Sequence, residues 1–263
     1  MQRLAAAAVG VTATASPRHP AIRIVGLKKR FGDRIALDDV SFDVAAGEVV
    51  AILGASGAGK TTLFRCVTRL AHSDCGQIFL GEHAMRTLGG RQLSMARSEV
   101  GLIFQQFNLI RRLSALDNVL AGRLGEVSTW RVMLRRFPPR DRQLALAALD
   151  RVGMLPYALQ RADNLSGGQQ QRVAIARALA QQSRFVLADE PVASLDPESA
   201  KSVLSILRDI ARERMIAVLV SLHQVELAIQ FADRVIGLRA GRMISDRPAA
   251  AFAQSDHRMI FAT

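Results

Sequence analysis

Residues 54–61 have the types and the spacing needed to hold a triphosphate. The run Gly54-Ala55-Ser56-Gly57-Ala58-Gly59-Lys60-Thr61 matches the pattern G-x-x-x-x-G-K-[ST] at every fixed position. Glycines let the backbone wrap closely around an anion, and the N–H groups of the loop and of the following helix start point toward it. Lys60 can reach the β and γ phosphates, the Thr61 hydroxyl can hold Mg²⁺, and Thr62 continues the helix start. These residues predict a nucleotide-binding site.

Two neighbouring carboxylates, Asp189 and Glu190, end the apolar run that begins at Phe185. An aspartate at the end of a strand beside a phosphate loop can position Mg²⁺ and its waters. The adjacent glutamate can orient or deprotonate a water that attacks the γ-phosphate. Ordinary strand-end carboxylates are the alternative, and the phosphate loop upstream favours the catalytic interpretation.

Three further residues lie at the ends of predicted strands. Gln105 follows the apolar run 100–104, and His223 follows a buried-type strand that begins at 215. A lone histidine is usually structural, but one at a strand terminus near the site can contact a γ-phosphate. Phe31 ends the strand region that starts at residue 22. A lone phenylalanine there is usually part of the core, although a flat ring can also stack on a purine.

A second helix start with anion-binding character follows at Leu165-Ser166-Gly167-Gly168-Gln169. Ser166 is a good N-cap, and the two glycines allow close backbone approach to an anion. The run 173–181 is rich in alanine and leucine and predicts a helix. A phosphate-binding helix start and a merely well-capped helix explain this stretch equally well.

The elements that must position these residues predict an α/β fold, because short apolar strands alternate with helical stretches. Residues 111–163 differ from the rest: they contain many arginines, the only tryptophan and a helical pattern over 141–152. We interpret them as a mostly helical insertion. The expected strands cover residues 22–25, 40–44, 48–53, 76–80, 100–104, 185–189, 215–220, 234–238 and 242–245, and a further helix is expected over 198–212.

The composition suits a single large α/β domain, with 263 residues, 49% hydrophobic content and a net charge of +12. The charge comes almost entirely from arginines spread along the chain, because lysine occurs only at positions 28, 29, 60 and 201. Scattered charge is typical of a solvated surface, so we expect no nucleic-acid partner. Two cysteines, Cys66 and Cys75, are too few for a disulfide framework and lack metal-binding spacing.

No stretch of the sequence approaches the roughly 18 apolar residues that a membrane span requires, so any membrane association is expected to be peripheral. Residues 1–21 are interpreted as an unstructured extension. Their alanine- and threonine-rich part superficially resembles a secretion signal but lacks a strong apolar core. Residues 247–263 are interpreted as a C-terminal tail.

Taken together, these motifs resemble the ATP-binding-cassette (ABC) ATPase family over about residues 22–246, chiefly through its signature at 165–169. The resemblance implies a P-loop NTPase core, an N-terminal antiparallel β subdomain and an inserted helical subdomain at about 106–165. It also implies a head-to-tail homodimer with two ATP molecules between the subunits. The phosphate loop of one copy and the signature of the other then enclose each ATP.

The same resemblance implies a role for each motif residue. Phe31 stacks on adenine, and Gln105 senses Mg²⁺ and the attacking water. Asp189 supports Mg²⁺ together with Thr61, Glu190 is the catalytic base, and His223 holds the γ-phosphate. Ser194, Leu195 and Asp196 form a loop at the dimer interface.

Within the family the chain looks most similar to ATP-binding subunits of bacterial phosphonate importers. The supporting stretches are 103–110, 189–200 and 222–228. This implies integral-membrane permease subunits as partners, an indirect link to a periplasmic phosphonate-binding protein, and a peripheral location on the cytoplasmic side of the inner membrane. ATPases that serve phosphate, amino acids or an exporter remain alternatives, as does a soluble nucleic-acid-associated ABC ATPase.

Overall fold

The computed structural model describes residues 20–134 and 136–261. Most of the extension expected at 1–21 lies outside these residues. Ala21 is described, and its N–H donates a 2.8 Å hydrogen bond to the carbonyl of Val44. Ala21, although it falls within the expected extension, therefore already pairs with the strand that contains Val44.

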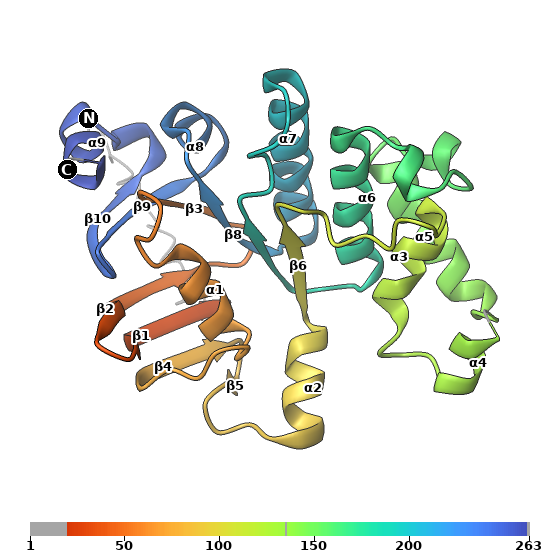
Figure 1. Cartoon of the computed structure of the whole chain (residues 1–263), viewed down its shortest axis with the longest axis horizontal. Helices are drawn as coiled ribbons and strands as arrows, with labels where there is room; N and C mark the ends of the chain where they lie inside the picture. The colour runs from red at the N-terminus through yellow and green to blue at the C-terminus, as the bar shows by residue number, and fades with distance from the viewer. Residues whose placement is uncertain (1–19, 135, 262–263) are drawn as a thin grey trace, which may run out of the picture.

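A six-stranded sheet forms the centre of the molecule (Figure 1), in the order β10-β9-β3-β8-β7-β6. The strands β9, β3, β8, β7 and β6 are parallel, and β10 pairs antiparallel with β9 at one edge. Their bounds are β3 Val49–Leu53, β6 Val100–Phe104, β7 Phe185–Asp189, β8 Ala217–Leu222, β9 Arg234–Arg239 and β10 Arg242–Pro248. The apolar character of β3, β7 and β8 follows from their burial on both faces of a parallel sheet.

The parallel arrangement brings the chemistry-bearing residues to one edge of this sheet. The phosphate loop follows β3, Gln105 follows β6, Glu190 follows β7 and His223 follows β8. Because the carboxyl ends of parallel strands meet at the same edge, four segments far apart in sequence converge there.

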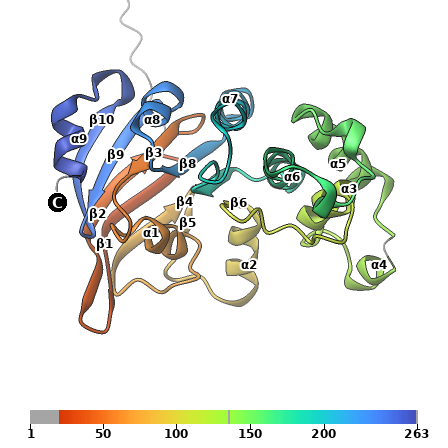
Figure 2. The ribbon, with the colours of Figure 1, turned by 45° about the horizontal axis from the view of Figure 1, so that its top comes forward.

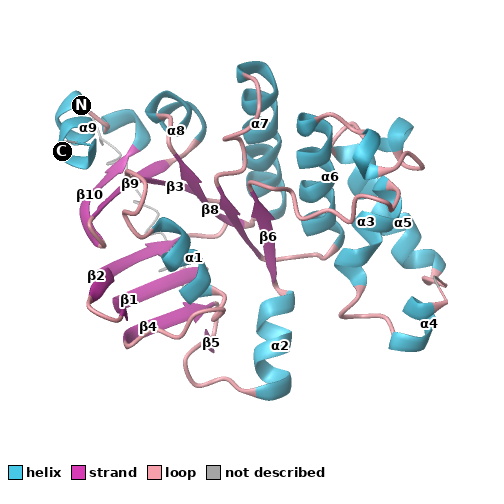
Figure 3. Cartoon of the chain, in the orientation of Figure 1, coloured by secondary structure: helices cyan, strands magenta, loops and turns pink. Residues whose placement is uncertain are grey.

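A smaller antiparallel sheet lies beside the first (Figures 1 and 3), in the order β2-β1-β4-β5. Its strands are β1 Ile22–Phe31, β2 Arg34–Val44, β4 Cys75–Leu80 and β5 His83–Ala84. The strands β1 and β2 alternate buried and exposed residues over much of their length, as expected for a sheet with one face in the core.

The helix α1, Lys60–Val67, lies between the two sheets (Figure 2). Its buried residues Leu63, Phe64 and Val67 share one hydrophobic core with side chains from both sheets, such as Ile24 and Ile52. The phosphate loop at the start of α1 is therefore anchored to a rigid core.

A second core forms where helices α6 Gly167–Ala180, α7 Pro197–Arg214 and α8 Val225–Phe231 pack against the six-stranded sheet. Val203 and Leu207 of α7 and Leu227 of α8 are buried in this core with Val218 and Val220 of β8. These helices cover one face of the sheet, and α1 together with the antiparallel sheet covers the other, so the parallel strands are buried on both faces.

The helical insertion extends to one side of the sheets (Figures 1 and 2). It contains α3 Ala115–Leu120, α4 Thr129–Met133, α5 Pro139–Arg151 and the short 3₁₀ turns η1 Ala121–Arg123, η2 Leu155–Tyr157 and η3 Ala162–Asn164. A buried ion pair joins two of these elements, because Nε of Arg123 lies 2.9 Å from Oδ1 of Asp141. Arg123 also donates to the carbonyl of Ala180 at the end of α6, so the insertion is fixed to the helix that follows it.

The α/β fold, the antiparallel sheet and the helical insertion predicted from the sequence are confirmed. Strands β1 and β2 are longer than predicted, and β8 begins at Ala217 because Met215 is the left-handed C-cap of α7. Among the described residues outside the insertion, three helices were not predicted: α2 Gly90–Ser98, α8 Val225–Phe231, and α9 Gln254–Phe261 within the expected C-terminal tail. Ile260 of α9 is buried, so this part of the tail is folded onto the domain.

Candidate nucleotide site

The phosphate loop joins β3 to α1 and needs glycine at particular positions. Gly59 has φ of 111°, in the left-handed region, and a β-carbon there would lie 2.4 Å from the carbonyl oxygen of Ala36. A β-carbon at Gly54 would lie equally close to the carbonyl oxygen of Leu238. These contacts fix the loop against neighbouring backbone, so its N–H groups are preorganised for an anion.

Lys60 is held inside the loop and is almost completely buried. Its ammonium group donates to the carbonyls of Gly54 at 2.7 Å and Ala55 at 3.3 Å. Burial lowers the pKa of Lys60, and the negative charges of Glu190 and Asp189 partly oppose this effect. A buried ammonium whose partners are mostly neutral carbonyls is well suited to receive a phosphate anion.

The two acidic residues at the end of β7 both hydrogen-bond to a serine of the adjacent strand. The backbone N–H of Glu190 donates to Oγ of Ser221 at 2.8 Å, and that hydroxyl donates to Oδ1 of Asp189 at 2.8 Å. Glu190 itself has φ of 52°, a left-handed conformation that is uncommon for residues other than glycine. Ser221 is fully buried.

His223 and Lys60 both approach the same oxygen of Glu190. Nε2 of His223 lies 2.6 Å from Oε1 of Glu190, and Nζ of Lys60 lies 3.9 Å from it. Glu190 therefore lies between the phosphate-loop lysine and the histidine after β8. The sequence expectation placed His223 on a γ-phosphate, and here its partner is the neighbouring carboxylate.

A hollow of about 450 Å³ lies over the phosphate loop. Phe31 borders it with half of its side chain exposed, and Lys29 Nζ lies 5.0 Å from the ring centroid. An exposed ring beside the loop can stack on a flat base. Arg34 of β2 also lines this hollow, and its Nη2 would lie 3.1 Å from a β-carbon placed on Gly57.

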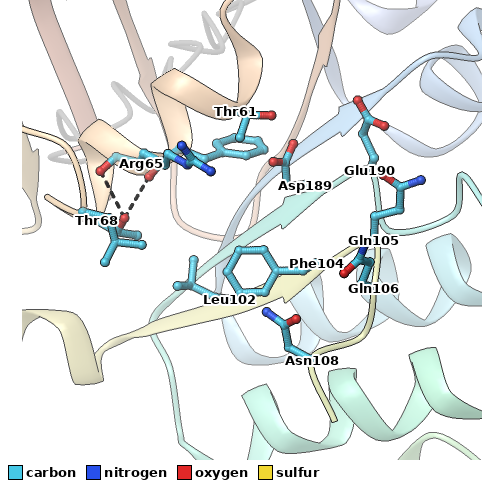
Figure 4. A pocket seen from close by; sticks show the side chains of 12 residues that line it. Thr61, Arg65, Thr68, Leu102, Phe104, Gln105, Gln106, Asn108, Asp189 and Glu190 are labelled. Atoms are coloured by element: carbon cyan, nitrogen blue, oxygen red, sulfur yellow. Dashed lines mark hydrogen bonds between the residues drawn. The ribbon is translucent and has the colours of Figure 1, made fainter. Parts of the chain in front are cut away.

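A second hollow, of about 420 Å³, lies beside the first and shares Thr61 and Glu190 with it. Figure 4 shows Thr61 on α1 across from Glu190 and Gln105, with Asp189 between them in this view. These side chains offer hydroxyl, carboxylate and amide oxygens. An oxygen-rich set of this kind fits Mg²⁺, which prefers oxygen ligands and retains several waters.

The signature residues form a helix start at a separate place in the chain. Ser166 caps α6 in a capping box, because its hydroxyl accepts from Gln169 N–H while the Gln169 side chain accepts from Ser166 N–H. A β-carbon at Gly167 would lie 3.5 Å from Leu195. In the described part of the chain, none of residues 165–169 lines either hollow. The second anion-binding element is well formed but lies outside this chain's own phosphate site.

The loop Ser194–Asp196, which was expected at a dimer interface, leads into α7. Asp196 caps that helix by accepting from the N–H groups of Glu198 at 3.1 Å and Ser199 at 2.9 Å. Hydrogen bonds from Ser199 keep the pKa of Asp196 below its ordinary value. The loop therefore presents an ionised carboxylate next to the helix start of α6.

The segment after Gln105 is attached to α6 and to α3 of the helical insertion. Arg177 of α6 donates to the carbonyls of Asn108 at 2.6 Å and Phe107 at 3.2 Å. Both of these residues have left-handed φ values. Asn118 of α3 accepts from the N–H of Ile110 and donates to its carbonyl. The segment that follows Gln105 is therefore held by both α6 and α3.

The structure brings most of the predicted site residues together. Those bordering the two hollows, or contacting a residue that does, are Phe31, Gly54–Thr62, Gln105, Asp189, Glu190 and His223. Sequence reasoning missed Arg34, Ser221 and Arg177. Ser221 was detectable in principle, because a serine two residues before His223 interrupts an otherwise apolar strand.

A phosphate loop between a parallel strand and a helix, followed by strand-end carboxylates, defines a P-loop NTPase. The antiparallel sheet and the helical insertion that ends in a capped signature helix define the cassette type. Residues 37–193 match the ABC transporter family, which is more than half of the chain. The chain belongs to this family, and it is an ABC ATPase.

Curated relatives cover most of the chain. It is 49% identical over 248 residues to the phosphonates import ATP-binding protein PhnC of Cupriavidus pinatubonensis, covering 92% of this chain and 88% of the relative. It is 48% identical over 232 residues to the hypophosphite import ATP-binding protein HtxD of Stutzerimonas stutzeri, covering 88% of this chain and 68% of the relative.

Solved structures agree with this assignment. The dimeric post-hydrolysis structure of the ATP-binding cassette MJ0796 bound to ADP and Pi is 30% identical, with a TM-score of 0.76. The match covers 88% of this chain and 100% of that one.

Across the residues described here, no helix has the length and apolar character needed to cross a membrane.

Proposed function

We propose that this chain is the ATP-hydrolysing subunit of a bacterial ABC importer for phosphonates. The observation that carries the ATPase part is the convergence of Lys60, Asp189, Glu190 and His223 at one edge of the sheet. We propose that the catalytic domain covers residues 22–246, with the helical insertion at about 106–165.

Each side chain at the site has a separate task in this proposal. The loop N–H groups of 54–62 and Lys60 bind the phosphates of ATP, and Phe31 stacks on adenine. Thr61, Asp189 and Gln105 hold Mg²⁺, which when bound neutralises charge on the phosphates. Glu190 accepts a proton from the attacking water, and His223 contacts the γ-phosphate.

The hydrolytic unit is proposed to be a head-to-tail homodimer. The phosphate loop of one copy binds ATP, and Leu165–Gln169 of the other copy close over the γ-phosphate. Two observations support this: the α6 helix start is fully capped, and it does not border the phosphate site of its own chain. Ser194–Asp196 lie next to that helix start and contact the partner.

Permease subunits are proposed to dock on the hollow shown in Figure 4. Its wall includes Leu70, whose side chain is largely exposed, and the segment that Arg177 and Asn118 tie to α6 and α3. This location lets a partner sense Gln105 and the insertion together. The ATPase is then placed peripherally on the cytoplasmic side of the inner membrane, and a periplasmic phosphonate-binding protein acts through the permease.

Phosphonate is the proposed cargo because PhnC proteins are among the relatives that match most of the chain. Hypophosphite is the second candidate, supported by the similarity to HtxD. Reconstitution with the permease and binding protein encoded by neighbouring genes distinguishes the two candidate cargoes. ATP hydrolysis stimulated by phosphonate and not by hypophosphite supports the first candidate, and the reverse pattern replaces it with the second.

Two variants test the ATPase assignment. Lys60→Ala is expected to weaken ATP binding by at least tenfold in a nucleotide titration, because it removes the buried ammonium. Glu190→Gln is expected to bind ATP normally and to hydrolyse it about 10² to 10⁴ times more slowly. Unchanged affinity in the first variant or unchanged turnover in the second contradicts the roles given to these residues.

A further inference from the structure

Ser221 is a buried hydroxyl in direct contact with both carboxylate residues of the site. It lies in β8 in register with Asp189 of β7, so the two side chains point to the same face of the sheet. Its oxygen accepts from the N–H of Glu190 and donates to Oδ1 of Asp189, each at 2.8 Å. Its exposed fraction is 0%.

We propose that Ser221 is a positioning residue for the ATPase reaction, which orients the metal-supporting and water-activating carboxylates together. This inference rests on the roles proposed for Asp189 and Glu190. It assigns to Ser221 a role of its own, because the hydroxyl is fully buried and Ser221 lines neither hollow.

The first effect of the hydroxyl is on Asp189. A carboxylate at the end of a strand can rotate, and either oxygen can face the metal. The bond from Ser221 uses one lone pair of Oδ1 and fixes the rotation of the carboxylate, so the oxygens present a defined geometry to Mg²⁺ or to its water shell. Holding the carboxylate in one rotamer reduces the ordering that metal binding requires.

The second effect is on the backbone of Glu190. This residue has a left-handed φ of 52°, a conformation that persists only where its surroundings enforce it. The hydroxyl of Ser221 accepts the Glu190 N–H and so helps to hold that conformation. The direction in which the Glu190 side chain leaves the strand end is thereby set by the same atom that orients Asp189.

Few residues can replace serine in this position. The site needs one oxygen that both donates and accepts, which among small side chains only serine and threonine provide. Alanine leaves the Glu190 N–H and the Asp189 oxygen without this partner in a buried place. The space vacated by one oxygen atom is too small for a water molecule to restore both bonds.

The test compares Ser221→Ala with Ser183→Ala in the full-length protein. Ser183 is also buried, and its hydroxyl donates to the carbonyl of Ala178, away from the site. Removing it costs one buried hydrogen bond without touching either carboxylate. ATP turnover is measured as a function of Mg²⁺ concentration. Binding of Mn²⁺ to the complex with a non-hydrolysable ATP analogue is followed by electron paramagnetic resonance.

Ser221→Ala is expected to lower kcat by about tenfold to a hundredfold and to weaken Mn²⁺ binding severalfold. Metal-free nucleotide binding should stay within about twofold, and Ser221→Thr should recover part of both losses. Ser183→Ala should leave kcat and Mn²⁺ binding unchanged. If Ser221→Ala does not fold, Ser221→Cys keeps a similar volume with weaker hydrogen bonds and should show the same direction of change.

Wild-type kcat and Mn²⁺ binding in a folded Ser221 variant overturn the inference, as does an equal loss in Ser183→Ala. Glu190→Gln is included to separate this result from the proposed function. If Glu190→Gln loses turnover while Ser221→Ala does not, only the positioning role fails. If Glu190→Gln keeps full turnover, the assignment of the site itself fails.

Discussion

Nε2 of His223 lies 2.6 Å from Oε1 of Glu190, at the ends of two adjacent parallel strands. Lys60 approaches the same oxygen from the phosphate loop at 3.9 Å. The carboxylate that is proposed to activate water is therefore held between two basic groups. In the proposed mechanism, a bound γ-phosphate would give Lys60 and His223 a competing anionic partner and would free Glu190 to face a water molecule.

Replacing His223 by alanine removes one of these two contacts. ATP binding should change little, because the loop N–H groups and Lys60 remain. Turnover should fall by about 10² or more, since the γ-phosphate loses a contact and Glu190 is no longer oriented by the imidazole. Steady-state hydrolysis and nucleotide titration on the same preparation check this, and an equal loss in binding and turnover contradicts it.

Arg177 is expected to contribute to stability through the carbonyls of Phe107 and Asn108. Its removal leaves two left-handed residues without the donor that holds them. Arg177→Ala should lower the free energy of unfolding by about 2 to 3 kcal/mol, measured by urea denaturation.

The matched control is Arg151→Ala, which breaks the exposed ion pair with Glu213. Exposed pairs contribute little, so this change should cost less than about 1 kcal/mol. Similar losses of unfolding free energy in the two variants would show that Arg177 contributes no more to stability than an exposed arginine does.

The two cysteines should differ sharply in reactivity. Cys66 of α1 is buried, and this burial raises the pKa of its thiol to about 11, whereas Cys75 is exposed. Only about one part in a thousand of Cys66 is then thiolate at pH 8, which is the reactive form. Ellman's reagent should modify one thiol in the native protein and two in denaturant. A native Cys75→Ser variant that still reacts at the wild-type rate disproves this.

Much of the fold was predictable because its strands are short apolar runs that end at recognisable residues. The strands β6 and β7 agree with the expected bounds, since Gln105 and Glu190 mark their ends. The helix α9 was not predictable, because its segment is short and largely polar and shows no clear hydrophobic period. The helix is held by the packing of Ile260 against the core. The lengths of β1 and β2 depend on their mutual pairing, which local sequence does not specify.

The site was predictable where a motif fixes residue type and spacing, as for 54–61 and 189–190. Contacts that depend on the register between neighbouring strands were not predictable from the sequence. Ser221 meets Asp189 only because β7 and β8 are aligned in one particular register. Arg34 reaches the phosphate loop because the β1–β2 hairpin folds over it, a tertiary relationship that no local pattern contains.

The central claim is that ATP binds to the phosphate loop of one copy and is enclosed by the signature of another. Size measurement by analytical ultracentrifugation of Glu190→Gln, with and without ATP, tests it most directly. The slowed variant should form an ATP-dependent dimer. Adding Ser166→Arg should abolish the dimer while ATP affinity of the monomer stays unchanged, because Ser166 lies away from the phosphate site of its own chain. A Glu190→Gln protein that stays monomeric at saturating ATP, or a double variant that still dimerises, would contradict the shared site.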